Sequence, residues 1–188
     1  MSERKKQIFS IGEEETSLSS MATPLPDWLP PIVKLQDFDG DSEKYLEHLF
    51  SIFETDFVRS TPSYEGQRVF YDKKDDGGRP GCFVHITTEE NKQTGEREIC
   101  LRRCERIAWV KAIIEHADDP AVLVWEIEHF GKKRASKRTC LFLEEGDFLI
   151  VLTEIKWGHY IVTAVYVDHP HQKRRHQEAY KKYKSVNP

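Results

Sequence analysis

The sequence has no long apolar run. No segment of the 188 residues approaches the roughly 18 consecutive apolar residues of a membrane-spanning helix. The first twenty residues also lack the apolar central region of a secretory signal peptide. We therefore expect a soluble, cytoplasmic protein without a membrane partner.

Signature motifs of several enzyme classes are also missing. The chain has no Walker phosphate loop, no dinucleotide-binding glycine pattern, no HExxH zinc motif and no nucleophile elbow. These absences argue against nucleotide hydrolysis, dinucleotide redox chemistry and zinc proteolysis. We expect no cofactor and no metal ion.

Cysteine is scarce, and its spacing does not indicate a structural zinc site. The four residues are Cys82, Cys100, Cys104 and Cys140. Only one close pair occurs, with three residues between its members, and it has no matched second pair. The pattern predicts four reduced and mostly buried thiols.

The charge balance excludes an overall basic coat for nucleic acid. The chain has 28 Lys and Arg against 32 Asp and Glu, for a net charge of −4. Two local basic clusters remain possible binding surfaces. The one near the C-terminus also contains Tyr180 and Tyr183, whose rings could stack on bases. The members of the two clusters are Lys132, Lys133, Arg134, Lys137 and Arg138, and then Lys173, Arg174, Arg175, Lys181, Lys182 and Lys184. A solvated loop and a solvated tail would have the same composition.

A third basic cluster surrounds Glu105. It consists of Arg102, Arg103, Arg106 and Lys111. The planar guanidinium fork of arginine suits a phosphate group. Glu105 could instead hold these arginines in salt bridges, so both interpretations stay open.

Hydrophobic periodicity predicts an α+β fold, with N-terminal helices followed by a four-stranded antiparallel β-meander and a C-terminal helix. We expect a disordered tail at 1–23 and a single domain at 24–184, which opens with a proline-rich extended arm at 24–35. Trp28 and Leu29 are the expected anchors of that arm. The expected helices are 41–58, 98–117 and the basic helix 170–184. The expected strands are 68–71, 81–88, 122–130, 138–144, 148–155 and 159–167.

His85 is the candidate general base. It lies within the predicted strand at 81–88, where Thr87 would share its face. A histidine of near-neutral pKa can remove the proton of a ribose 2′-hydroxyl, and the oxygen then attacks the adjacent phosphate without a metal. A lone histidine in a strand is more often structural. Alternation in the meander puts Trp125 in the core, so Glu126 and Tyr166 could line a polar concave face. Glu126 could equally be a solvated strand residue.

Several runs resemble a known family. They are WLPPIV (28–33), FETDF (53–57), FVHITTE (83–89), RRCERIAWVKAIIEHADDPAVLVWE (102–126), LFLEEGDFLIVLTE (141–154) and HYIVTAVYV (159–167). Together they resemble uncharacterised phage-related proteins of bacteria and prophages, which are similar to the phage barnase–EndoU–colicin–RelE-like nucleases. The resemblance implies a core of helices and a four-stranded sheet, and metal-independent RNA cleavage.

The resulting hypothesis is an RNA endonuclease, a toxin or phage-conflict effector acting on tRNA or mRNA and countered by an antitoxin or immunity protein. His85 would be the general base, Arg103 and Arg106 would hold the phosphate, and Thr163 or Tyr166 would position it or the leaving group. The expected substrate-binding residues are Lys111, Glu126, Lys132, Lys133 and Arg134.

The alternative is a non-catalytic module of phage origin that binds protein or nucleic acid. The enzyme hypothesis predicts that His85, Arg103 and Arg106 converge in a cleft. The alternative predicts a buried His85 far from both arginines.

Overall fold

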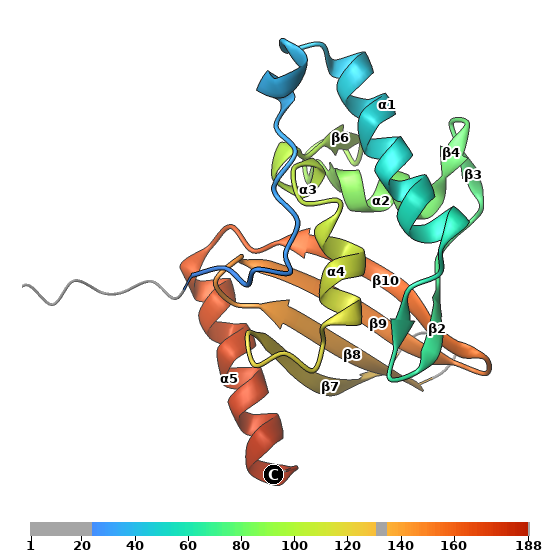
Figure 1. The fold of residues 1–188 in the computed structure, drawn as a ribbon. Helices are drawn as coiled ribbons and strands as arrows, with labels where there is room; N and C mark the ends of the chain where they lie inside the picture. Colours follow the sequence, from blue (N-terminus) through green and yellow to red (C-terminus); the bar gives the residue numbers. More distant parts are fainter. Residues whose placement is uncertain (1–23, 131–134, 188) are drawn as a thin grey trace, which may run out of the picture.

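A computed structural model of the chain describes residues 24–130 and 135–187, which form an α+β fold (Figure 1). The helices are α1 (Ser42–Phe53), α2 (Gly81–Thr87), α3 (Leu101–Cys104), α4 (Trp109–Glu115) and α5 (Pro170–Val186). The main sheet contains β1 (Ser63–Tyr64), β2 (Gln67–Phe70), β7 (Val122–Phe130), β8 (Ala135–Leu143), β9 (Phe148–Ile155) and β10 (Gly158–Tyr166). Two small ribbons pair β3 (Asp75–Asp76) with β4 (Arg79–Pro80), and β5 (Thr88–Glu90) with β6 (Arg97–Ile99).

The main sheet has six strands in the order β1-β2-β10-β9-β8-β7, where the sequence predicted four. Each of β7, β8 and β9 pairs antiparallel with the next strand along the chain. The other two strands form the β1–β2 hairpin, in which β2 corresponds to the strand predicted at 68–71. β2 runs parallel to β10, with Val69 opposite His159. This pairing covers only the start of β10, so the rest of that edge is left to helices.

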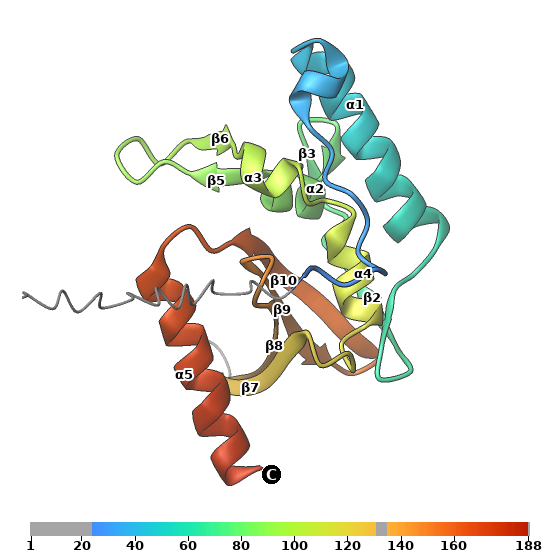
Figure 2. The ribbon, with the colours of Figure 1, turned by 60° about the vertical axis from the view of Figure 1, so that its left-hand side comes forward.

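Each face of the sheet carries its own core. The main core contains Leu49, Phe53, Ile113 and Ile150, and fills the space between one face and helices α1, α2 and α4. The second core lies between the opposite face and α5, which Figure 2 shows on the other side of the sheet from α4. We call that opposite side the α5 face. The predicted C-terminal helix is confirmed, and its apolar side chains complete the second core.

Residues 81–88 form helix α2 rather than the predicted strand. Cys82, Phe83 and Ile86 are all buried, and spacings of one and three residues put them on one side of a helix. Burial of that side in the main core outweighs the β preference of the Val, Ile and Thr residues in this segment.

The helical backbone of α2 also separates His85 from Thr87. The Thr87 hydroxyl donates to the carbonyl of Phe83, at 2.7 Å, within the same helix, whereas His85 faces β10. The expectation that the two side chains share a face is therefore wrong.

Most other predicted elements are present with small changes of boundary. The strands at 122–130 and 148–155 coincide with β7 and β9. The helix at 41–58 is α1 followed by a π-helical turn, Glu54–Arg59. The segment 98–117 is divided into α3 and α4 by a turn at 105–108. The tail at 1–23 lies outside the described residues.

The arm at 24–35 packs against the main core through both expected anchors, Trp28 and Leu29. The Trp28 ring stacks on His116, with centroids 4.4 Å apart, and its Nε1 donates to Asp119, at 2.9 Å. The four cysteines are free and buried, as expected. Within the described segments, no helix is long and apolar enough to cross a membrane.

Candidate functional site

A pocket of about 660 Å³ opens beside the uncovered edge of β10. β2 ends at Phe70, and α2 lies across the part of β10 that β2 leaves free. One wall of the pocket is therefore sheet and another is helix. The polar lining residues are Asp72, Lys74, Asp75, Asp76, His85, Arg97, Thr153 and Tyr160.

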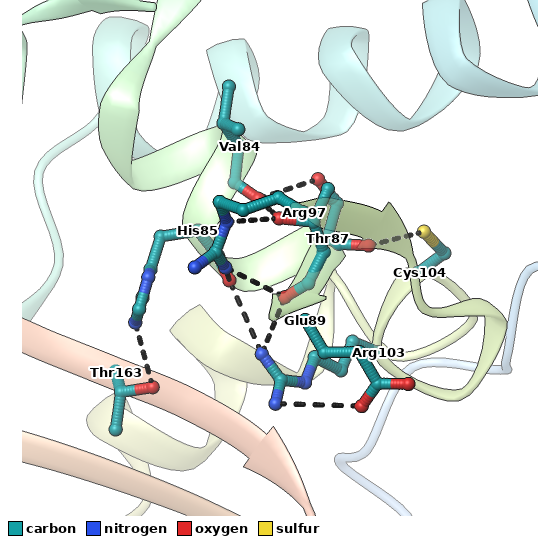
Figure 3. Close-up of polar contacts among 9 residues, drawn as sticks. Val84, His85, Thr87, Glu89, Arg97, Arg103, Cys104 and Thr163 are labelled. Carbon is teal, nitrogen blue, oxygen red and sulfur yellow. Dashed lines mark hydrogen bonds and ion pairs between the residues drawn. The ribbon is translucent and has the colours of Figure 1, made fainter. Parts of the chain in front are cut away.

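His85 projects from α2 toward β10 and lines this pocket (Figure 3). Its Nε2 lies 3.1 Å from the Thr163 hydroxyl. Burial lowers the pKa of His85, and the positive charges of Arg97 and Arg103 lower it further. Both effects favour the neutral imidazole, which is the form that a general base needs.

Two arginines occupy the carboxyl end of α2. Arg97 donates to the carbonyls of His85 and Thr88, at 3.2 and 3.0 Å. Arg103 donates to the same two carbonyls, at 3.4 and 2.6 Å (Figure 3). The last carbonyls of a helix have no partners within the helix and carry partial negative charge, so both cations stabilise this end.

The two arginines differ in their access to the pocket. Arg97 lines it, and its Nε also holds the Thr88 hydroxyl at 2.7 Å. Arg103 is not among the lining residues, its side chain is only 15% exposed, and it lies 4.0 Å from Glu89. Arg103 is therefore close to His85 through the helix backbone but turned away from the imidazole.

Arg106 does not join His85. Its guanidinium donates to Glu105, at 3.0 Å, and lies between the rings of Tyr166 and Trp109, 4.5 and 5.0 Å from their centroids. Only 11% of the side chain is exposed. Arg106 and Tyr166 thus form a packed cation–π contact rather than part of the pocket.

Other predicted binding residues are dispersed. Lys111 pairs with Glu115 at 2.7 Å and lines a different pocket, between α4 and α1. Glu126 accepts a hydrogen bond from Tyr183 and pairs with Lys137, so it does not share a site with Tyr166. Lys132, Lys133 and Arg134 lie outside the described residues.

The tyrosines of the basic helix are not free platforms. Tyr180 and Tyr183 pack against the second core, and the Tyr183 hydroxyl donates to Glu126 at 3.1 Å. Cations on the outer side of α5 remain exposed: Arg174, Arg175, Lys181, Lys182 and Lys184.

Sequence reasoning missed Arg97, Thr153 and Tyr160. Arg97 follows a polar stretch without periodicity, so nothing local indicates that β6 places it at a helix end. Thr153 and Tyr160 face each other across β9 and β10. The predicted hairpin turn implies that these two residues are paired. No local sequence pattern indicates that the pair lines a pocket.

Comparisons with known proteins leave the predicted family untested. No family model, no curated protein and no solved structure matches the chain. The resemblance to phage-related nucleases stays a prediction from the sequence.

Proposed function

We propose that this protein is a metal-independent ribonuclease whose general base is His85. The observation that carries the proposal is the position of His85: an imidazole hydrogen-bonded to Thr163, on the wall of a pocket that Arg97 also lines. These groups supply the two requirements of RNA cleavage through the 2′-hydroxyl, a base and a cation for the phosphate.

The proposed reaction is an intramolecular transfer. His85 takes the proton of the ribose 2′-hydroxyl, whose oxygen bonds to the adjacent phosphorus. The bond from phosphorus to the 5′-oxygen of the next nucleotide breaks, and that oxygen takes a proton from water. The products are a 2′,3′-cyclic phosphate and a free 5′-hydroxyl.

The residues divide into reacting and supporting groups. The Thr163 hydroxyl orients the imidazole, and the tautomer that donates from Nε2 to Thr163 leaves the lone pair on Nδ1. Arg97 would bind a phosphate oxygen and stabilise its growing negative charge. Arg103 supports the helix end that presents His85, and Arg106 with Tyr166 supports the adjoining core.

Incubation of RNA with the purified chain in excess EDTA tests this function. Wild type should give discrete fragments ending in a 2′,3′-cyclic phosphate, and His85→Ala should lose at least about 100-fold in rate, the lower range for a general base. His171→Ala, at an exposed position, is the control. Because the pKa of His85 is lowered, the acid limb of the rate should lie below about pH 6.5. Full activity in His85→Ala would contradict the proposal.

Arg97 and Arg103 provide a matched pair of variants. Both contact the carbonyls of His85 and Thr88, so Arg97→Gln and Arg103→Gln should each lower the melting temperature. Only Arg97 lines the pocket. Arg97→Gln should therefore reduce kcat/KM more than Arg103→Gln at a temperature where both variants are folded. Equal losses would reduce Arg97 to a structural cation.

A second function is favoured by the separation of Arg106 from His85. Arg103 and Arg106 were both predicted to bind the phosphate, but Arg103 donates to the carbonyl of Thr88 and Arg106 donates to Glu105. A non-catalytic module that binds RNA or protein has no need for them to converge. Binding of RNA without cleavage by the folded wild type would favour this function.

A further inference from the structure

A row of side chains leads from the His85 pocket across the α5 face. Arg138 of β8 is opposite Thr153 of β9, and Thr153 is opposite Tyr160 of β10. Thr153 and Tyr160 line the pocket. Neighbouring strands are about 4.8 Å apart, so Arg138 begins one strand away from the pocket wall.

Arg138 is a cation without a counter-charge in the described part of the chain. Its Nε is buried and has no hydrogen-bond partner. The neighbouring Lys137 points to the other side of β8, where it pairs with Glu126. The side chain as a whole is only half-buried, and an anionic ligand on this face would give its guanidinium the counter-charge that it lacks.

The β9–β10 hairpin ends in an unusually exposed aromatic ring. Trp157 is 73% exposed, and the Nζ of Lys156 lies 4.7 Å from its ring centroid. The turn is held close to β2, because a Cβ atom on Gly158 would lie 2.2 Å from the carbonyl oxygen of Arg68. Trp157 is therefore presented to solvent from an anchored turn rather than from a loose loop.

The pocket and the tryptophan lie along one hairpin. Trp157 is three residues from Tyr160, which corresponds to about 10 Å along an extended strand. Between them on the α5 face is the partly exposed Ile155, which has the same alternation as Thr153. The carboxylate between these two residues, Glu154, alternates to the opposite face with its partner His159.

This combination of charge and ring favours single-stranded nucleic acid. Arg138, on the strand beside the hairpin, and Lys156, at the hairpin turn, offer cations to a phosphate backbone, and an exposed indole offers a base a stacking surface. A membrane surface would need a wider apolar patch, and an acidic peptide would not need the ring.

We propose that a single strand of RNA lies along the β9–β10 hairpin, with a phosphate on Arg138 and a base stacked on Trp157. This inference rests on the proposed ribonuclease function, and it assigns the path of the strand that leaves the pocket. Both residues bind substrate outside the reacting bond.

The test measures binding separately from cleavage. A fluorescent single-stranded oligonucleotide with 2′-O-methyl groups throughout cannot be cleaved, and its affinity is read by anisotropy at several salt concentrations. Trp157→Ala should weaken binding about 5- to 150-fold, and Trp157→Phe should keep most of it. Arg138→Gln should weaken binding and reduce the salt slope by about 0.7.

Matched controls remove the same chemistry elsewhere. Arg59→Gln removes an exposed arginine, and Val58→Ala removes a 55% exposed apolar side chain, both on the π-helical turn after α1. Neither should change the affinity by more than twofold. Trp157 is exposed, so its variants should melt with wild type even if Arg138→Gln unfolds.

The outcomes separate this inference from the proposed function. Unchanged affinity in Trp157→Ala, or equal losses in the controls, would overturn the inference even if wild type cleaves RNA. Absence of binding by wild type would overturn it as well. Hairpin-dependent binding without any cleavage would support the strand path and contradict the ribonuclease.

Discussion

At the scale of the residue, His176 shows how one titratable group couples α5 to the sheet. Its ring lies 5.8 Å from that of Trp125 and 5.5 Å from that of Phe142, between centroids. Burial lowers the pKa of His176, and the charge of Arg175 lowers it further. The folded protein thus favours the neutral imidazole at this position.

The sign of the pH effect follows from that shift. Below the ordinary histidine pKa of about 6.5, the unfolded chain binds a proton that folded His176 resists. This contribution to stability is complete above about pH 6.5 and is lost as the pH falls toward the lower pKa of the folded state. His85 contributes in the same direction, because its pKa is also lowered.

Thermal unfolding across this range tests the role of His176. We expect the melting temperature to fall as the pH drops below about 6.5, and His176→Phe to reduce that fall because phenylalanine fills the aromatic site without titrating. His171→Phe, at an exposed position, should keep the wild-type dependence. A His176→Phe variant with the wild-type slope would refute the assignment.

At the scale of the element, the β9–β10 hairpin is fixed to β2 by Gly158. This residue has φ +140°, and a side chain there would meet the carbonyl of Arg68. Only glycine combines that conformation with so close an approach of two backbones. The parallel pairing of β2 with β10 depends on this contact.

Gly158→Ala should therefore destabilise the protein by more than backbone strain alone, which is about 1–3 kcal/mol. Gly95→Ala is the matched control, because Gly95 also has positive φ, +74°, but no atom within 4 Å of the added Cβ. The free energies of unfolding come from urea titration. An equal decrease in the free energy of unfolding in both variants would show that the contact between the added Cβ and the Arg68 carbonyl does not destabilise the protein.

At the scale of the whole molecule, one sheet forms a wall of both cores. Phe53 is fully buried in the main core, and Phe142 is fully buried in the second core beneath α5. Disruption of either core should loosen strands that the other core also needs. We expect the two cores to unfold together.

Phe53→Ala and Phe142→Ala should each lower the free energy of unfolding by about 3–5 kcal/mol, as for other buried phenylalanines. Each variant should show one transition, coincident by circular dichroism and tryptophan fluorescence. A second transition in Phe142→Ala, in which α5 and the second core melt first, would contradict a single cooperative unit.

The sequence determined the elements whose burial follows a simple period. Apolar runs bounded by turn residues located β7 and β9 to the residue, and a stripe with helical spacing located α1. α1 buries one side against the main core, whereas β9 is buried on both faces. The Trp28 anchor and the free cysteines were also accessible from residue type. These predictions depend only on local spacing and on which side chains avoid water.

The tertiary structure alone decided the rest. The segment 81–88 has strong β propensity, yet it is helical because Cys82, Phe83 and Ile86 reach the main core together only on a helix. β2 joins the sheet through residues 90 positions away in the chain, which no local pattern specifies.

The candidate site was decided in the same way. His85 and Thr163 were both named from the sequence and lie together, but Arg97 from β6 was not, and Arg106 packs against Tyr166 instead of joining them. A site assembled from distant segments depends on which cations the fold uses for its own carbonyls and rings. Sequence spacing does not indicate whether a given cation binds a ligand or pairs with a carbonyl or ring of the protein, because those partners meet only when distant segments pack.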